Sequence, residues 1–310
     1  MDPHLASSWA DLRVIEGLFE ALVVLDPVTK EAIPGMAEAW ESSNGGKKWR
    51  FKIREGAKWS NGDSITSLDF IRSAQRMLDP HMGSEIVVHF LYLLKNAENY
   101  HRGNLARFDE VGIHAENDRT LQFELEYPGT SFLVQLSYFF PVQESNFPEG
   151  RFRDGTFRWG MEEANVSNGA YRLKGWVTNE LIVLEKNPFY WDAEKVRLDE
   201  IHFFPISDLS AEERAFRAGQ LDITSKVPNG RVAWYQKNVP QALRVDERLG
   251  LFFLQLNHGI EPLNKVEVRK ALAMSINRKE LVDLVLKDGK QAASWVLPPG
   301  LLHRSTDNSP

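Results

Sequence analysis

Apolar and polar residues alternate along several short stretches, which is the pattern of strands with one buried face. In residues 49–53 apolar side chains alternate with basic ones, and the preceding Asn44-Gly45-Gly46 favours a tight turn. The same alternation predicts a hairpin over residues 111–126, with its turn at Asn117-Asp118, and another over residues 171–185. Further strands are predicted at residues 201–205, 221–224 and 249–256, the last of them nearly all apolar and therefore buried on both faces.

Apolar residues at every third or fourth position predict helices between these strands. Thr66 with Asp69 predicts a helix start that is followed by Phe70, Ala74 and Met77 at helical spacing. Three more helix starts are predicted at polar pairs, namely Ser210 with Glu213, Asn264 with Glu267 and Asn277 with Glu280. Two helix ends are predicted at Gly219 and Gly289. Hairpins mixed with strand–helix–strand units indicate α/β or α+β lobes and exclude a helix bundle.

Composition narrows the class of protein. A chain of 310 residues suits two or three lobes, and 43% apolar with 26% charged residues excludes wholesale disorder. The net charge of −6 argues against a nucleic-acid binder. With no cysteine, disulfides and thiolate chemistry are excluded. No apolar stretch approaches the roughly 20 residues that cross a bilayer, and we expect no signal peptide at Met1.

Catalytic motifs are missing from the sequence. There is no phosphate-binding glycine loop, no G-x-S-x-G and no H-E-x-x-H, so we expect no cofactor, no metal and no catalytic residue. The adjacent pairs Glu162-Glu163 and Glu212-Glu213 point in different directions on a helix and predict a solvated acidic face. Carboxylates distant in sequence could still meet, so a glycoside hydrolase remains an alternative.

The tryptophans fall into two groups. Trp40, Trp49, Trp59 and Trp191 lie beside other apolar residues, and we expect them in a core. Trp9 follows two serines just before a helix-like stretch, where an exposed ring could line a cleft.

Several longer motifs keep a fixed order along the chain, and they fall at residues 35–40, 49–63, 168–171, 187–192, 218–222 and 268–272. Together they resemble the family-5 extracellular solute-binding proteins of ABC importers. Residues 175–185 are similar to the oligopeptide-binding branch of that family. The block W-x-F-x-[IL]-R…W-S-x-G over residues 49–62 is the most specific of them.

The resemblance implies an α/β fold like that of type II periplasmic binding proteins, with two lobes, a hinge and an extra inserted subdomain. Residues 1–19 with 144–250 would form the first lobe, residues 20–143 the inserted subdomain, and residues 251–310 the start of the second lobe. Hinge closure around a ligand is an established motion of such binders.

The resemblance also implies a function. The protein would be a monomer that captures oligopeptides in the periplasm, or another extracytoplasmic space, and delivers them to an inner-membrane ABC permease. Peptide backbone would pair with protein backbone, which gives affinity with little sequence preference. The alternatives are a relative tuned to nickel, haem or a sugar, and a glycoside or peptide hydrolase.

Matched position by position, the family's peptide-contacting residues fall on Ser7, Ser8, Trp9, Ile86, Ser225, Lys226, Arg248 and Gln255. Three of these depart from the family pattern. Ser7 stands where an acidic residue is common, Ile86 replaces an aromatic ring, and Gln255 replaces a carboxylate. Gly250 stands where some relatives have a cysteine of a disulfide.

Length is the largest departure, because family members continue well past residue 300. We therefore expect a chain that is truncated at both ends, with an incomplete second lobe. Since such proteins hold the ligand between two lobes, we also expect weak or no peptide affinity in this chain.

Overall fold

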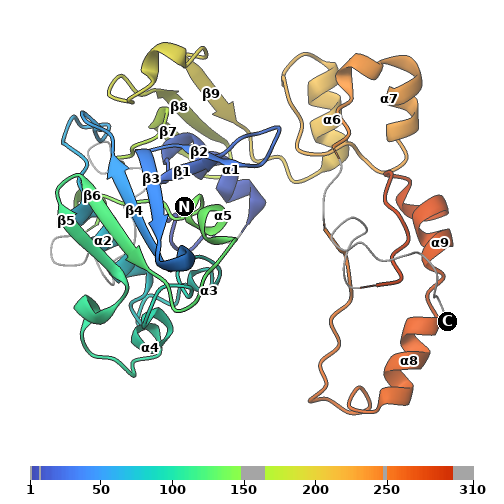
Figure 1. Cartoon of the computed structure of the whole chain (residues 1–310). Helices are drawn as coiled ribbons and strands as arrows, with labels where there is room; N and C mark the ends of the chain where they lie inside the picture. Colours follow the sequence, from blue (N-terminus) through green and yellow to red (C-terminus); the bar gives the residue numbers. More distant parts are fainter. Residues whose placement is uncertain (1, 7, 148–164, 247–249, 296–310) are drawn as a thin grey trace. The chain divides into compact units, whose positions relative to one another are not determined.

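The computed structural model describes residues 2–6, 8–147, 165–246 and 250–295 (Figure 1). The chain divides into two compact units, Met1–Pro205 and Ile206–Pro310. The lobe and subdomain boundaries expected near residues 20, 144 and 251 stay predictions.

The described residues of the first unit form three antiparallel sheets. In the largest the strand order is β3-β4-β6-β5, and the others are β1-β2 and β7-β8-β9. The strands are β1 (Val23–Leu25), β2 (Ala32–Pro34), β3 (Ala37–Ser43), β4 (Lys48–Ile53), β5 (Ile113–Asn117), β6 (Thr120–Glu124), β7 (Tyr171–Val177), β8 (Leu181–Lys186) and β9 (Glu200–Phe203). The hairpins predicted around residues 117–118 and 178–179 are confirmed.

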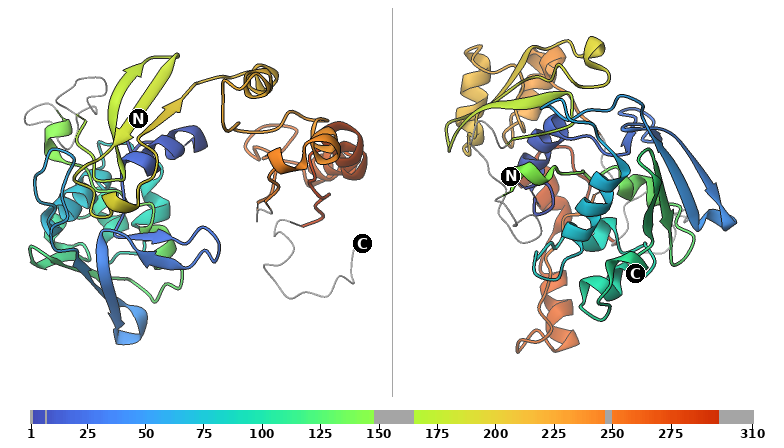
Figure 2. Two further views of the ribbon diagram at one scale, coloured as in Figure 1. Left: turned by 90° about the horizontal axis from the view of Figure 1, so that it is seen from above. Right: turned by 90° about the vertical axis from the view of Figure 1, so that its left-hand side faces the viewer.

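Helices cover these sheets. Helix α2 packs on β5, and α1 packs on β7. Figure 2 shows α1, in dark blue, beside the yellow-green strands of β7 and β8. The helices of this unit are α1 (Trp9–Leu18), α2 (Ser67–Met77), α3 (Val87–Phe90), α4 (Ala97–His101) and α5 (Phe132–Leu136).

Strand β4 shows the one-sided burial that its alternation predicts. Phe51 and Ile53 are buried, whereas Arg50 and Lys52 point to solvent. Phe51 meets Phe123 of β6 edge-on, with ring centroids 5.4 Å apart. Such edge-to-face pairs add stability beyond the area that they bury, so the large sheet and α5 share one aromatic core.

Helix α2 begins as the sequence predicts. The Thr66 amide donates to Oδ2 of Asp69 over 2.7 Å, and this capping box satisfies amides that have no partner within the helix. Phe70, Ala74 and Met77 are buried along one stripe, and the helix ends before Asp79-Pro80.

Gly112 lies where the chain passes very close to β6. A Cβ added there would lie 2.1 Å from the carbonyl oxygen of Glu124. Because a backbone atom cannot move aside cheaply, Gly112→Ala is expected to lower the free energy of unfolding by about 2 kcal/mol or more. Gly175→Ala is the control, since its methyl group meets nothing within 4 Å. Urea unfolding checks both, and equal losses would contradict the prediction.

The second unit is helical in its described part. It contains α6 (Leu209–Arg217), α7 (Val232–Asn238), α8 (Val266–Met274), α9 (Arg278–Glu280) and the π-helical turn η6 (Leu281–Leu286). Arg231 and Tyr235 bind Oε1 of Glu213 over 2.9 and 3.1 Å, which joins α7 to α6.

Two strand predictions in this unit are wrong. Residues 221–224 form no strand, and neither do residues 250–256, the described part of the strand predicted at 249–256. Ile223 and Phe252 are 84% and 87% exposed. Apolar sequence alone does not make a strand, because its backbone groups need a neighbouring strand to bond to.

Several helix ends in this unit also differ from the prediction. Asp208, not Ser210, caps α6 by accepting from the Ala211 amide over 2.6 Å. Helix α8 begins after Lys265, and η6 ends at Lys287 with a left-handed φ of 48°, before Gly289. The cap at Asn277 is confirmed, since its side chain accepts from the Glu280 amide.

Glu212 and Glu213 do not form a solvated acidic face, so that prediction is wrong. Glu212 is 8% exposed, and its carboxylate accepts from the amide and hydroxyl of Ser225 over 2.6 and 2.8 Å. Glu213 binds Arg231. Glu162 and Glu163 lie outside the described residues.

Candidate functional site

Two predicted peptide-contacting residues lie at the start of α1. Ser8 caps the helix, accepting from the Asp11 amide over 3.1 Å and donating to its carboxylate over 2.6 Å. Trp9 is the first helical residue and is 62% exposed, as the sequence predicts. Its ring is therefore presented on a fixed helix end.

Ile86 lies in the same unit, immediately before α3. Its side chain is partly buried and packs against the core. Two residues earlier, the hydroxyl of Ser84 donates to the carbonyl oxygen of His4 over 2.7 Å. This bond ties the loop that leads to Ile86 to the turn that leads to Ser8.

A fully buried arginine fixes that turn. Arg76 of α2 is 0% exposed and forms two hydrogen bonds to the carboxylate of Asp2, over 3.1 and 2.5 Å. Its guanidinium also lies 2.9 Å from Nδ1 of His4 and over the ring of Phe147. We call Asp2, His4 and Arg76 the N-terminal clamp.

The clamp sets the protonation of His4. A guanidinium only donates, so Nδ1 of His4 accepts, and the ring proton lies on Nε2, which donates to the carbonyl of Phe140 over 2.9 Å. Burial, followed by the charge of Arg76, lowers the pKa of His4 to about 4. His4 is therefore neutral at physiological pH.

The other predicted site residues are found in the second unit or are not described. Ser225 binds Glu212, while Lys226 and Gln255 are exposed to solvent. Ser7 and Arg248 lie outside the described residues. The peptide site made of all eight residues therefore stays a prediction.

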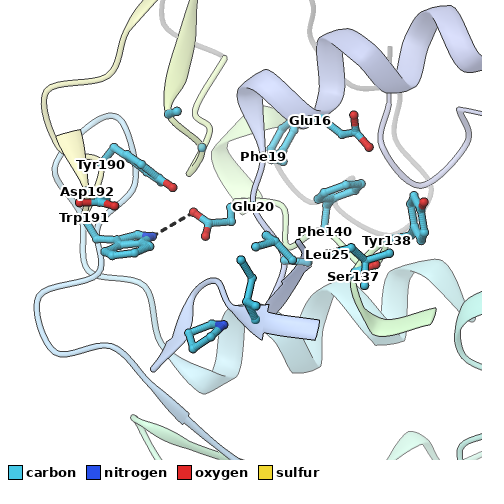
Figure 3. A pocket seen from close by; sticks show the side chains of 16 residues that line it. Glu16, Phe19, Glu20, Leu25, Ser137, Tyr138, Phe140, Tyr190, Trp191 and Asp192 are labelled. Carbon is cyan, nitrogen blue, oxygen red and sulfur yellow. Dashed lines mark hydrogen bonds between the residues drawn. The ribbon is translucent and has the colours of Figure 1, made fainter. Parts of the chain in front are cut away.

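The first unit also holds a cavity of about 500 Å³ (Figure 3). It is bounded by the last turn of α1, the β1–β2 hairpin, residues 137–140 and the turn at residues 190–192. In Figure 3 the indole of Trp191 and the hydroxyl of Tyr190 both point toward the carboxylate of Glu20. Sequence reasoning missed this cavity.

Glu20 is the buried carboxylate of this cavity, with an exposed fraction of 7%. Nε1 of Trp191 donates to Oε2 over 2.9 Å. Burial raises the pKa of Glu20 to about 7, although hydrogen bonds from Tyr190 and Trp191 and the charge of Arg54 oppose the increase. The carboxyl group therefore titrates near neutrality.

Two asparagines of the recognised motifs hold this region together. The Glu20 amide donates to Oδ1 of Asn168 over 3.1 Å, and Nδ2 of Asn168 donates back to the Glu20 carbonyl over 2.8 Å. Asn187 likewise donates to the carbonyl of Gly169 over 2.9 Å. A Cβ at Gly169 would lie 2.7 Å from Leu18, so these motif residues serve close packing between α1 and β7.

The role of Arg76 was not predicted. The sequence did hold a signal for a buried arginine. Arg76 directly precedes Met77 of the apolar stripe, and Asp-Pro-His at residues 2–4 offers an acidic partner and a histidine. Among the described residues no group of three histidine or acidic side chains could hold a metal ion.

Comparison with known proteins assigns the fold to a family. The model of "Bacterial extracellular solute-binding proteins, family 5 Middle" matches residues 31–310. The chain belongs to this family. Family-5 proteins are components of solute transport, as the sequence motifs indicate.

Peptide-binding proteins are among the relatives of this family-5 chain. It is 34% identical over 301 residues to the periplasmic oligopeptide-binding protein OppA of Salmonella typhimurium, a match that covers 96% of this chain and 54% of OppA. The structure of the murein tripeptide binding protein MppA of Escherichia coli matches with a TM-score of 0.88 and 33% identity, covering 97% of this chain and 58% of MppA.

A third match is Haemophilus influenzae OppA in complex with the peptide RPPGFSPFR, with a TM-score of 0.84 and 31% identity, covering 93% of this chain and 56% of OppA. The predicted α/β fold of type II periplasmic binding proteins is thus confirmed. The chain spans little more than half the length of these relatives. No helix in the described part of the chain is long and apolar enough to cross a membrane.

Proposed function

We propose that this family-5 chain captures oligopeptides for an ABC importer and carries no catalytic activity. The observation that carries the proposal is its similarity, over 93% of its length, to a relative that was solved with a bound peptide. The OppA of Salmonella typhimurium is likewise named for oligopeptide binding.

The first unit supports this role with a rigid platform. Trp9 is exposed at a capped helix end, and the N-terminal clamp anchors the turn before it. A peptide backbone lying along residues 7–9 would bond to protein backbone, which tolerates varied peptide sequences. Ile86 would border one side chain of that peptide and offer it an apolar contact.

In the second unit we propose contacts from Ser225, Lys226, Arg248 and Gln255. Ser225 is fixed by the buried carboxylate of Glu212, so its backbone is presented in one conformation. Gln255 is uncharged, which would leave the peptide's charged groups without a carboxylate partner there.

We place the protein outside the cytoplasmic membrane, as a monomer that passes its peptide to a membrane permease. The OppA proteins of Salmonella typhimurium and Escherichia coli are named as periplasmic proteins, which supports this location.

A mixed pool of tri- to pentapeptides tests the proposal on the 310-residue protein. At millimolar peptide concentration we expect the indole NMR signal of Trp9 to shift, because the ring lies at the proposed site. Trp9→Ala should reduce peptide retention in native mass spectrometry, whereas Trp295→Ala, at another exposed tryptophan, should not.

Two outcomes would overturn the proposed function, and a third would overturn the role of Trp9. Retention of a metal, haem or sugar without peptide would indicate a different solute. Hydrolysis of the pool would indicate an enzyme. Equal peptide retention by both tryptophan variants would remove Trp9 from the site.

A further inference from the structure

The charged side chains that line the cavity beside Glu20 in the described part of the chain are all acidic. Glu16, Glu20 and Asp192 are the charged side chains among the described residues that line it. Its volume of about 500 Å³ falls in the range of small-molecule sites. All three lining charges favour a cation over an anion.

The rest of the wall is mainly apolar and aromatic. Rings from three parts of the first unit meet there, namely Phe19, Tyr138, Phe140, Tyr190 and Trp191. The face of an aromatic ring is negative and attracts an ammonium group, especially where water is excluded. The rings and the carboxylates therefore select the same class of ligand.

Glu20 is oriented before any ligand arrives. Asn168 binds both its amide and its carbonyl group, and its carboxylate accepts from Trp191 and Tyr190. Arg54, whose charge acts on Glu20, does not line the cavity. Arg54 lies 3.5 Å from the ring centre of Trp191, and its Nε donates to the carbonyl of Gly35 over 2.6 Å. No lysine or arginine among the described residues that line the cavity therefore competes with a cationic ligand for Glu20.

We propose that this cavity binds a small organic ammonium ion with an aromatic or aliphatic body. The ammonium group would lie at the carboxylate of Glu20, and the body would lie among the rings and the side chains of the β1–β2 hairpin. This site is independent of the proposed peptide site, since none of its lining residues belongs to the predicted peptide contacts.

Binding would be coupled to the titration of Glu20. The groups that face Glu20 are Arg54, Tyr190, Trp191 and Asp192, and Glu16 of α1 lines the same cavity. Because the pKa of Glu20 is about 7, a cation that needs the ionised form displaces a proton below that pH. The association constant should then rise by up to about tenfold per pH unit until pH 7.

Three probes of similar shape test the charge selectivity on the 310-residue protein: 2-phenylethylammonium, 2-phenylethanol and 3-phenylpropionate. In calorimetry at pH 8 we expect the ammonium ion to bind at least tenfold more tightly than the alcohol, and the carboxylate most weakly. The indole NMR signal of Trp191 should shift with the ammonium ion. Equal binding of all three probes, or no binding of the ammonium ion, would overturn the proposal.

Variants then locate the site. Glu20→Gln should weaken binding of the ammonium ion at least tenfold at pH 8, because the amide keeps the shape of the side chain but not its charge. It should also remove the dependence of this affinity on pH. Glu180→Gln, at an exposed turn, is the matched control and should bind like the parent. Asp192→Asn is a second variant, should Glu20→Gln not fold, and is expected to weaken binding about two- to fivefold. Unchanged affinity in a folded Glu20→Gln or Asp192→Asn protein, or an equal loss in the control, would overturn the assignment.

Discussion

Arg76→Met is expected to lower the free energy of unfolding by about 3–5 kcal/mol. The guanidinium is fully buried and binds both Asp2 and His4. Removing it leaves a carboxylate that is itself 8% exposed without its charged partner, and burying an uncompensated charge is expensive. Urea unfolding at pH 7, followed by far-UV circular dichroism, measures the loss.

Arg72→Met is the matched control, because it removes an arginine from the same helix. Arg72 pairs with Glu144 over 3.2 Å, but both side chains are about half exposed. Such surface pairs contribute about 1 kcal/mol or less. If the two variants lost equal stability, burial would not be the source of the effect of Arg76.

Glu20→Gln is expected to change how stability depends on pH. The folded protein keeps the Glu20 proton up to about pH 7, whereas the unfolded chain releases it near 4.5. The stabilisation from Glu20 is thus complete below pH 4.5 and is lost as the pH rises through 7. At about 1.4 kcal/mol per pH unit, the parent should lose about 3 kcal/mol relative to the variant across this window.

His4 titrates with the opposite sign and hides this trend in the parent. Its pKa is lowered from 6.5 to about 4, so its contribution is present above 6.5 and is lost as the pH falls toward 4. The two effects largely cancel between pH 4.5 and 6.5. Urea unfolding of the parent and of Glu20→Gln from pH 4.5 to 7.5 gives the difference between their free energies of unfolding, in which the contribution of His4 cancels. A difference that does not change with pH would contradict the prediction.

The hairpins and caps of the first unit were predictable because their signals are local. Phe51 and Ile53 alternate with charged residues whatever lies elsewhere in the chain, and Thr66 meets Asp69 within one helical turn. In the second unit local signals failed. An apolar run such as residues 250–256 predicts a strand, but a strand also needs a neighbour, which the run itself does not specify.

The candidate sites were predictable only in part, for the same reason. The exposure of Trp9 follows from its polar surroundings in sequence. The N-terminal clamp joins residues 72–74 positions apart, and Trp191 reaches Glu20 across 171 positions. No spacing rule links residues at such distances. The neutral state of His4 and the raised pKa of Glu20 therefore follow from the structure and not from the sequence.

The paired hydrogen bonds between Glu20 and Asn168 also bear on the order of folding. They join positions 148 residues apart, and closing a flexible loop of that length costs on the order of 4 kcal/mol of chain entropy. Hairpins such as β3–β4 and β7–β8 close over a few residues and form within microseconds. If the β4–β6 pairing forms first, it shortens the open chain between residues 20 and 168. We therefore expect the two hydrogen bonds of Asn168 to form late in folding, after the chain between residues 20 and 168 has become structured.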